Sequence, residues 1–447
     1  MRQSFLSKLE PFGDSDAIVF NGKTYSYTYL LQLADDWRGY LDLHGVKPGE
    51  VVTLEGEYSP QACAGLLALI DLGAINVPLT SLPDAKREEF LDVAQVEVVI
   101  KIGERQDRSC QRTQRNADHE LYDQLRRGAR PGLVLFSSGT SGRSKASVLD
   151  FQKVLSRYGD PKRSRRILSF LNLDHIGGVN TLLHTLSQGG AVVTVPERTP
   201  DAVFAAIAEH HVQVLPTTPT FLNMALISGA YERYSTEELE LITYGTEPMP
   251  PPTLQRLKAA LPNVRLKQTY GLSELGILPT RSKSDDTVWL QLGSAGFEHK
   301  IIDGILWIRS DMAMLGYLNA PAPFDEDGFF NTQDVVETDG EYIRVLGRRS
   351  EIINVGGEKV YPSEVESVLL EVANIAEATV CGRPSPVTGM VVKATVQLAQ
   401  PEDERSVIRR ARKHCRERLE PYKVPAVIEI SSARQHSERF KKIRSAA

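Results

Sequence analysis

The chain of 447 residues contains few cysteines, and these are widely separated. Its four cysteines, Cys63, Cys110, Cys381 and Cys415, form no Cys-x-x-Cys spacing. A disulfide framework and a zinc site built on cysteine pairs both need closer, regular spacing, so neither is expected. The cysteine pattern instead favours a protein of a reducing compartment.

Long apolar runs and a strong charge of one sign are also missing. The first ten residues hold no apolar core long enough for a signal peptide, and no later run approaches membrane-spanning length. A net charge of −5 over the whole chain gives no general attraction to nucleic acid or to anionic membranes. We therefore expect a soluble, cytoplasmic protein with no nucleic-acid partner and no membrane insertion.

The segments that are present alternate between short apolar strands and amphipathic helices, an order that favours a parallel sheet. Residues 18–25 predict a hairpin around Asn21-Gly22, and Ser26 is placed to cap the helix that follows. By contrast, residues 103–130 are polar and aperiodic and predict a surface connection or a partly disordered insert. A chain of this length needs two or three structural units.

A glycine- and hydroxyl-rich loop follows the apolar strand Leu133–Phe136. Glycines allow backbone N–H groups to approach an anion, and hydroxyls and a lysine add donors and charge, so the loop predicts a phosphate cradle. Its residues are Ser137, Ser138, Gly139, Thr140, Ser141, Gly142 and Lys145. The common P-loop is excluded, because that motif ends in Gly-Lys-Ser/Thr and here Lys145 follows Ser144.

This loop resembles the phosphate loop of the adenylate-forming superfamily, which holds acyl-CoA synthetases, firefly luciferase and the adenylation domains of nonribosomal peptide synthetases. Ser137, Ser141, Ser144 and Ala146 are mild departures from the usual Thr-Ser-Gly-Thr-Thr-Gly-x-Pro-Lys-Gly. Further motifs resemble the family's in the same order. They are Thr269-Tyr-Gly-Leu-Ser-Glu274, Asn331-Thr-Gln-Asp334, Gly347-Arg348 and Gly356-Gly-Glu-Lys-Val-Tyr-Pro-Ser-Glu-Val-Glu366.

The resemblance implies an α/β fold in two parts. Residues 1–347 are expected to form a large N-terminal domain of stacked α/β subdomains, and residues 348–447 a small, mobile α+β C-terminal domain. Ser350 stands where the family usually carries an Asp or Lys hinge; serine can absorb the dihedral change but brings no charge.

The family's chemistry joins ATP and a carboxylic acid into an acyl-adenylate with release of pyrophosphate, after which a thiol of CoA or of a carrier-protein phosphopantetheine attacks. By resemblance, the phosphate loop holds the β- and γ-phosphates, and Glu274 and Thr140 coordinate Mg²⁺. Tyr270, next to Gly271, is expected against the adenine ring, and Asp334 and Arg348 on the ribose hydroxyls. Gln333 replaces the usual glycine, which leaves the role of the aspartate intact but changes its backbone.

The catalytic lysine of the family closes a Pro-x-x-x-x-Gly-Lys motif, and residues 431–444 contain no Gly-Lys. An ungapped count from Pro425 puts Lys441 in the lysine position, whereas a short gap would put Arg439 there. An arginine keeps the charge but not the compact ammonium geometry, so the gapped alignment predicts slow adenylation. A disordered basic tail is the remaining alternative.

The acyl site is less clearly marked. His175 lies where CoA ligases of the family carry a histidine near the acyl pocket, and an ordinary loop histidine is the alternative. Five apolar residues are expected either in an acyl or aryl pocket or in the core: Phe221, Leu222, Met224, Leu275 and Ile277. A basic cluster is expected to be a solvated face rather than a site for CoA phosphates or a carrier protein: Lys153, Arg157, Lys162, Arg163, Arg165 and Arg166.

The sequence thus predicts an AMP-forming acid–thiol ligase, similar to short acyl- or aryl-CoA ligases, that uses ATP, Mg²⁺ and CoA. Two alternatives stay open. The acyl group is loaded onto a carrier protein, or the chain is a nucleotide-binding regulatory protein that has lost turnover, as Ser350 and the missing Gly-Lys would allow.

Overall fold

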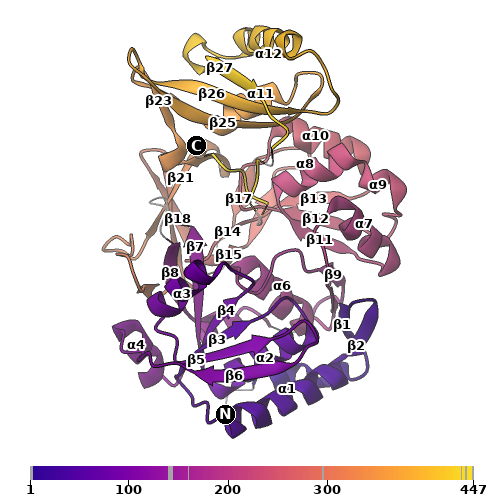
Figure 1. The fold of residues 1–447 in the computed structure, drawn as a ribbon, viewed down its shortest axis with the longest axis vertical. Coiled ribbons are helices and arrows are strands. Elements are labelled where there is room, and N and C mark those ends of the chain that lie inside the picture. The colour runs from indigo at the N-terminus through magenta and orange to yellow at the C-terminus, as the bar shows by residue number, and fades with distance from the viewer. Residues whose placement is uncertain are drawn as a thin grey trace.

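The computed structural model describes residues 4–138, 144–159, 161–293, 296–433, 435–437 and 440–444. Figure 1 shows a large lower part, coloured indigo to pink, and a smaller yellow part above it. Within the described ranges, no helix combines the length and apolar character that crossing a membrane requires.

The first sheet has seven strands in the order β20-β8-β7-β4-β3-β5-β6. Its strands are β3 (Val51–Glu55), β4 (Ile75–Leu79), β5 (Val98–Ile102), β6 (Arg108–Arg112), β7 (Gly132–Ser138), β8 (Ser144–Asp150) and β20 (Gly316–Tyr317). The pairs among β3, β4, β5 and β7 are parallel, as the alternating pattern predicts, and β6 and β8 run antiparallel to their neighbours. The helices from this part of the chain are α1 (Tyr27–Leu43), α2 (Pro60–Leu72), α3 (Asp84–Val93), α4 (Glu120–Arg127) and α5 (Phe151–Leu155).

The prediction that residues 103–130 form a surface connection or a partly disordered insert is wrong. The segment forms the edge strand β6 and helix α4, which buries Leu121, Tyr122 and Leu125. An edge strand keeps one row of backbone groups and much of its side-chain surface in water, so its sequence stays polar. Helix α4 has only eight residues, too few for its apolar spacing to stand out from the polar residues around it.

The second sheet also has seven strands, in the order β13-β12-β11-β9-β10-β1-β2. They are β1 (Asp16–Phe20), β2 (Lys23–Ser26), β9 (Arg166–Leu168), β10 (Ala191–Val193), β11 (Val214–Thr217), β12 (Leu241–Tyr244) and β13 (Arg265–Gln268). The accompanying helices are α6 (Ile176–Ser187), α7 (Pro200–Glu209), α8 (Pro219–Ser228), α9 (Ala230–Arg233) and α10 (Pro251–Ala260).

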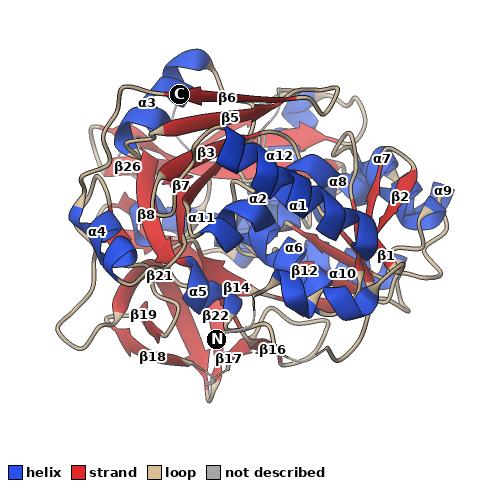
Figure 2. Cartoon of the chain, turned by 90° about the horizontal axis from the view of Figure 1, so that it is seen from below, coloured by secondary structure: helices blue, strands red, loops and turns tan. Residues whose placement is uncertain are grey.

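The predicted hairpin is confirmed as β1 and β2, with positive φ at both turn residues, Asn21 and Gly22. Ser26 caps α1, as predicted, by accepting a hydrogen bond from the Tyr29 N–H. The hairpin joins the second sheet because β1 pairs in parallel with β10, with Ile18 opposite Val192. One core cluster connects α1, α2 and α6 with strands of both sheets, and Figure 2 shows these helices beside one another between the strands.

The third sheet is antiparallel, with the order β16-β17-β22-β21-β19-β18. Its strands are β16 (Thr280–Ser282), β17 (Leu290–Leu292), β18 (Phe297–Ile302), β19 (Ile305–Ser310), β21 (Phe330–Asp339) and β22 (Tyr342–Arg348). A short antiparallel pair, β14 (Tyr270–Leu272) and β15 (Gly276–Leu278), precedes it. Four 3₁₀ turns complete the list: η1 (Leu6–Lys8), η2 (Glu10–Phe12), η3 (Arg349–Glu351) and η4 (Pro421–Lys423).

The small domain has its own sheet and its own core. Its elements are β23 (Ile353–Val355), β24 (Glu358–Val360), α11 (Pro362–Leu369), β25 (Ile375–Ser385), β26 (Gly389–Leu398), α12 (Glu404–Arg418) and β27 (Val427–Ile430). The predicted fold class, a large α/β part followed by a small α+β part, is confirmed. Ser350 lies in η3, between the third sheet and the small domain; the boundary at 347/348 and the hinge stay predictions.

Candidate active site

Three of the residues predicted to bind the nucleotide meet at one carboxylate. Asp334 on β21 lies opposite Arg348 on β22, and Tyr270 begins β14. Tyr270 Oη donates to Asp334 Oδ2 at 2.5 Å, and Arg348 Nε lies 2.8 Å from Oδ1. Each carboxylate oxygen therefore has one fixed donor and keeps lone-pair capacity for a further one.

The backbone before Asp334 holds this carboxylate in place. Thr332 Oγ1 accepts a hydrogen bond from the Asp334 N–H and donates to the Leu306 carbonyl, and Asn331 Oδ1 accepts from the Gln333 N–H. Gln333 has φ of +62°, the left-handed conformation that glycine adopts most easily. The replacement of the family's glycine by Gln333 thus changes the residue but retains a glycine-like backbone.

The electrostatics of this cluster follow from its burial, since Asp334 is only 6% exposed. Burial raises the pKa of Asp334, and the charge of Arg348 and the hydrogen bond from Tyr270 oppose that rise without cancelling it. The neighbouring carboxylate raises the pKa of Arg348, which stays charged. Burial and Asp334 together raise the pKa of Tyr270 well above its ordinary value, so its phenol remains a neutral donor.

The predicted metal ligand Glu274 is also buried and is oriented by a tyrosine that sequence reasoning missed. Tyr317 Oη donates to Glu274 Oε1 at 2.7 Å, and Lys145 Nζ lies 5.1 Å from the centre of the Tyr317 ring. Tyr317 comes from β20, which pairs with β8 just after the phosphate loop. No local pattern marks Tyr317, because a two-residue strand is too short to show a periodicity.

The phosphate loop connects two antiparallel strands, with Ser137 opposite Lys145. The predicted strand before the loop is confirmed as β7, and a strand follows the loop where a P-loop has a helix. Predicted cradle residues Gly139, Thr140, Ser141 and Gly142 lie outside the described residues, as does the side chain of Ser138.

The C-terminal tail returns to the large domain beside α8 (Figure 1). The charge of Lys441, the lysine of the ungapped alignment, also lowers the pKa of Asp334, but by less than Arg348 and Tyr270 do. Its own N–H donates to Ser437 Oγ at 3.3 Å. Arg439, the alternative, lies outside the described residues. Residues 440–444 make buried contacts, unlike the disordered tail that the sequence left open.

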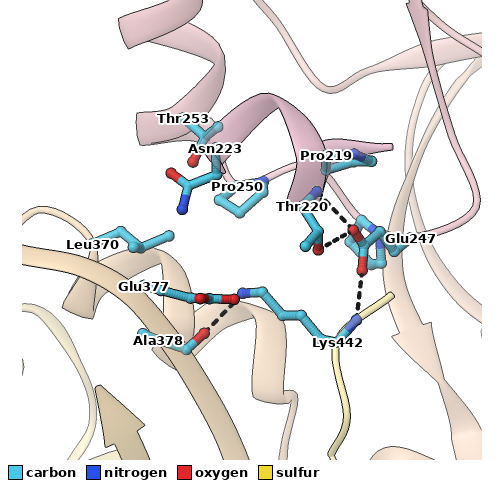
Figure 3. A pocket seen from close by; sticks show the side chains of 11 residues that line it. Pro219, Thr220, Asn223, Glu247, Pro250, Thr253, Leu370, Glu377, Ala378 and Lys442 are labelled. Carbon is cyan, nitrogen blue, oxygen red and sulfur yellow. Dashed lines mark hydrogen bonds between the residues drawn. The ribbon is translucent and has the colours of Figure 1, made fainter. Parts of the chain in front are cut away.

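The next residue, Lys442, joins the two domains. Its Nζ lies 3.0 Å from Glu366 Oε2 and donates to the Ala378 carbonyl, and its N–H donates to Glu247 Oε2. Figure 3 shows Lys442, Ala378 and Glu247 around a cavity between α8 and β25. That cavity, of about 10 Å³, has room for one water at most, so it is not an acyl pocket.

His175 forms the N-cap of α6, where its Nδ1 accepts from the Gly177 N–H at 3.0 Å. Because Nδ1 accepts this hydrogen bond, the proton of the neutral His175 ring lies on Nε2. The expected role at the acyl pocket stays a prediction. Of the apolar candidates, Phe221, Leu222 and Leu275 are fully buried in the core, and Met224 and Ile277 pack against it partly exposed.

Several arginines of the basic cluster that begins in α5 form ion pairs with carboxylates of other segments. Arg163 and Arg165 face Glu240, and Arg166 lies 2.6 Å from Asp16. Arg157 packs over the Phe297 ring instead, and burial lowers its pKa. These carboxylate partners favour the predicted solvated face over a site for phosphates.

Comparison with known proteins agrees with this geometry. Residues 6–318 match the family model for the AMP-binding enzyme, and residues 364–441 match that for the AMP-binding enzyme C-terminal domain. The chain is 29% identical over 442 residues to an indoleacetate–CoA ligase of Aromatoleum aromaticum, which covers 87% of this chain and 86% of that protein.

Two solved structures share the fold across nearly the whole chain. The anthranilate CoA ligase AuaEII in complex with anthranoyl-AMP has a TM-score of 0.83 and 21% identity, over 99% of this chain and 95% of that one. The o-succinylbenzoate CoA synthetase of Bacillus subtilis with its acyl-adenylate has a TM-score of 0.80 and 23% identity, over 99% and 97%. The chain therefore belongs to the AMP-binding enzyme family of the adenylate-forming superfamily and is an AMP-forming acid–thiol ligase of the acyl-CoA synthetase type.

Proposed function

We propose that this ligase activates an aromatic carboxylic acid with ATP and transfers the acyl group to CoA. One observation carries the assignment of the site: Tyr270 and Arg348, both predicted to bind the nucleotide, hold the buried carboxylate of Asp334 at 2.5 Å and 2.8 Å. Aromatic acids are favoured because indoleacetate, anthranilate and o-succinylbenzoate are named for the related ligases.

Asp334 is proposed to accept hydrogen bonds from the ribose hydroxyls, with the Arg348 guanidinium donating to them. Tyr270 fixes one oxygen of Asp334 through its hydroxyl and offers its ring to the adenine. Because Tyr270 and Arg348 fix the orientation of the Asp334 carboxylate, the ribose hydroxyls would meet an acceptor that is already oriented.

In the first half-reaction a carboxylate oxygen of the acid attacks the α-phosphorus, and the bond to pyrophosphate breaks. Lys441 is proposed to lie between the carboxylate and the α-phosphate, where its ammonium stabilises the charge that develops on the phosphate oxygens. The phosphate loop, including Thr140 and Lys145, holds the leaving pyrophosphate.

Glu274 and Thr140 would hold a Mg²⁺ ion beside the phosphates, where the ion would neutralise part of their charge. No group of three or more His, Cys, Asp or Glu side chains within the described ranges gathers as a metal site. A single buried carboxylate, Glu274, fits a Mg²⁺ that takes most of its ligands from phosphates and water. The hydrogen bond from the Tyr317 hydroxyl fixes the orientation of the Glu274 carboxylate.

In the second half-reaction the sulfur of CoA attacks the acyl carbonyl, and AMP leaves. The small domain is proposed to rotate about Ser350 for this step, and the Gly356–Glu366 motif to contribute to the thiol tunnel. CoA is favoured over a carrier protein because this motif resembles that of CoA ligases and because the similar proteins are CoA ligases.

The test measures pyrophosphate release with ATP, Mg²⁺ and a panel of aromatic, short-chain, long-chain and amino acids. Acyl transfer is then measured to CoA and, separately, to a phosphopantetheinylated carrier protein. Turnover with an aromatic acid and CoA supports the proposal. Transfer to the carrier alone would overturn the assignment of CoA, and nucleotide binding without pyrophosphate release across the panel would favour a regulatory protein.

A further inference from the structure

Phe440, the residue before Lys441, is buried in a backbone conformation that disfavours it. It occupies the position of the family's glycine and has φ of +53°, in the left-handed region. Its side chain is nevertheless only 6% exposed and belongs to a core cluster of the large domain. A phenylalanine in this conformation persists only where its surroundings compensate for the strain.

The compensating contacts all come from the large domain or from the tail itself. The Phe440 ring centre lies 5.1 Å from that of Phe170 and 5.6 Å from that of Phe221, and His436 stacks on it at 5.5 Å. The Phe440 carbonyl accepts from Thr218 Oγ1 at 3.0 Å. Phe170, Phe221 and Thr218 are all fully buried, so the ring enters a preformed aromatic site.

The side chains after Lys441 attach to the small domain, although the Lys442 N–H still donates to Glu247 of the large domain. Lys442 and Arg444 both pair with Glu366 of α11, at 3.0 Å and 2.9 Å, and all three side chains are at least nine-tenths buried. Lys441 therefore lies between two attachments of the tail, one on each domain.

The two attachments of the tail differ in the free energy that breaking them costs. Separating Lys442 and Arg444 from Glu366 would leave buried charges without partners, which is strongly unfavourable. Withdrawing Phe440 exposes one ring but also relieves its left-handed backbone. When the small domain moves away from the large one, the contacts that can release are those of Phe440 and the hydrogen bond from the Lys442 N–H to Glu247.

We propose that Phe440 is a positioning residue for Lys441. Seated between Phe170 and Phe221, its ring holds the lysine at the nucleotide during adenylation, and the ring leaves this site when the small domain rotates for thioester formation. This inference rests on the role proposed for Lys441.

The experiment follows the two half-reactions separately in single turnover. Adenylation is measured as pyrophosphate release, and transfer as thioester formation from a chemically synthesised aryl-adenylate and CoA. Phe440→Gly removes the ring and relieves the backbone, and Phe440→Ala removes the ring alone. We expect both variants to slow adenylation at least ~10-fold, while transfer stays as fast as in the wild type or becomes faster.

Phe204→Leu in α7 is the matched control, because it removes an equally buried ring from the same core cluster away from the tail. It should lower the melting temperature without changing the ratio of the two rates. If Phe440→Gly slows both half-reactions equally, or neither, the inference is overturned.

A readout without catalysis separates this inference from the proposed function. The Lys442 N–H donates to Glu247, so its hydrogen exchange reports whether the tail is seated. We expect Phe440→Gly, but not Phe204→Leu, to lose this protection. If Phe440→Gly loses this protection while the wild type keeps it but activates no acid, the anchor stands and the proposed function is refuted. Retained protection in Phe440→Gly would refute the anchor, whatever the activity.

Discussion

Lys442 and Glu366 form an ion pair that connects the C-terminal tail to α11, with the carboxylate only 1% exposed and its oxygen 3.0 Å from the ammonium nitrogen. For the adjacent lysine, Lys441, the charge contributes to lowering the pKa of Asp334 of the large domain. Two consecutive residues of the same type thus have different surroundings, and their substitution should separate catalysis from stability.

We expect Lys441→Ala to lower the rate of adenylation about 10²- to 10³-fold, the usual loss when one group that stabilises developing charge is removed. Lys442→Met should lower adenylation much less but reduce the melting temperature more, because it leaves the buried Glu366 with one partner fewer. Pyrophosphate release and thermal unfolding are measured on both variants. If Lys442→Met slows adenylation more than Lys441→Ala does, and Lys441→Ala lowers the melting temperature more than Lys442→Met does, the ungapped alignment is refuted.

The stability that Glu366 contributes should depend on pH. Burial raises the pKa of Glu366, but Lys442 and Arg444 outweigh it and bring the pKa to about 2, from an ordinary value of 4.5. A carboxyl group whose pKa is lower in the folded than in the unfolded protein stabilises the fold at any pH above its unfolded-state pKa. For Glu366 this stabilisation is about 3 kcal/mol, and it is lost as the pH falls from 4.5 toward 2.

Urea unfolding of the wild type and Glu366→Gln should therefore differ most at neutral pH, and the difference should shrink from pH 5 to pH 3. Comparing the two proteins removes the contribution of other carboxylates. A difference that is constant over this range would show that Glu366 is not held ionised by the tail.

The hydroxyl of Tyr270 should matter for ATP binding through Asp334. We expect Tyr270→Phe to raise the KM for ATP about 10-fold, because a hydrogen bond to a charged group is worth about 1.5–3 kcal/mol. Tyr122→Phe is the control, since it removes a buried hydroxyl that donates to the Ala94 carbonyl, away from the site. Equal KM values in the two variants would refute the role of Tyr270.

Tyr317 should influence the metal requirement without contacting the metal. Because its hydroxyl orients Glu274, Tyr317→Phe is expected to raise the Mg²⁺ concentration for half-maximal pyrophosphate release about 10-fold. Glu274→Gln should shift the curve further. An unchanged Mg²⁺ titration in Tyr317→Phe would mean that Glu274 needs no such support.

Two glycines provide a test of the fold itself. A Cβ at Gly178, in α6, would overlap the carbonyl of Asn172, so Gly178→Ala should destabilise the protein by about 3 kcal/mol. Gly39 lies within α1 with nothing near its Cβ position, and Gly39→Ala should stabilise it by about 0.5–1 kcal/mol. Denaturant unfolding of the two variants measures both changes in the free energy of unfolding, a decrease for Gly178→Ala and an increase for Gly39→Ala.

The parts of the site that local motifs encode were predictable from the sequence. Asp334 and Arg348 were predicted as one functional pair, and the structure places them opposite each other on neighbouring strands. The contact of Tyr317 with Glu274 and that of Glu366 with Arg444 were not predicted. The two residues of each pair lie 43 and 78 positions apart, and no spacing rule connects them. In the antiparallel third sheet the hairpins are local, but the pairing of β17 with β22 joins residues 53 positions apart, Leu290 and Ile343, and no spacing rule predicts it.

The pairing of β1 with β10 also has a consequence for how the chain folds during synthesis. Val192 leaves the ribosome roughly 170 residues after Ile18, its partner in the sheet. At about 5–20 residues per second, the hairpin β1–β2 waits on the order of 10–35 s before its neighbouring strand exists. During that interval its apolar residues Ile18 and Val19, buried in the finished sheet, are open to chaperones and to other chains.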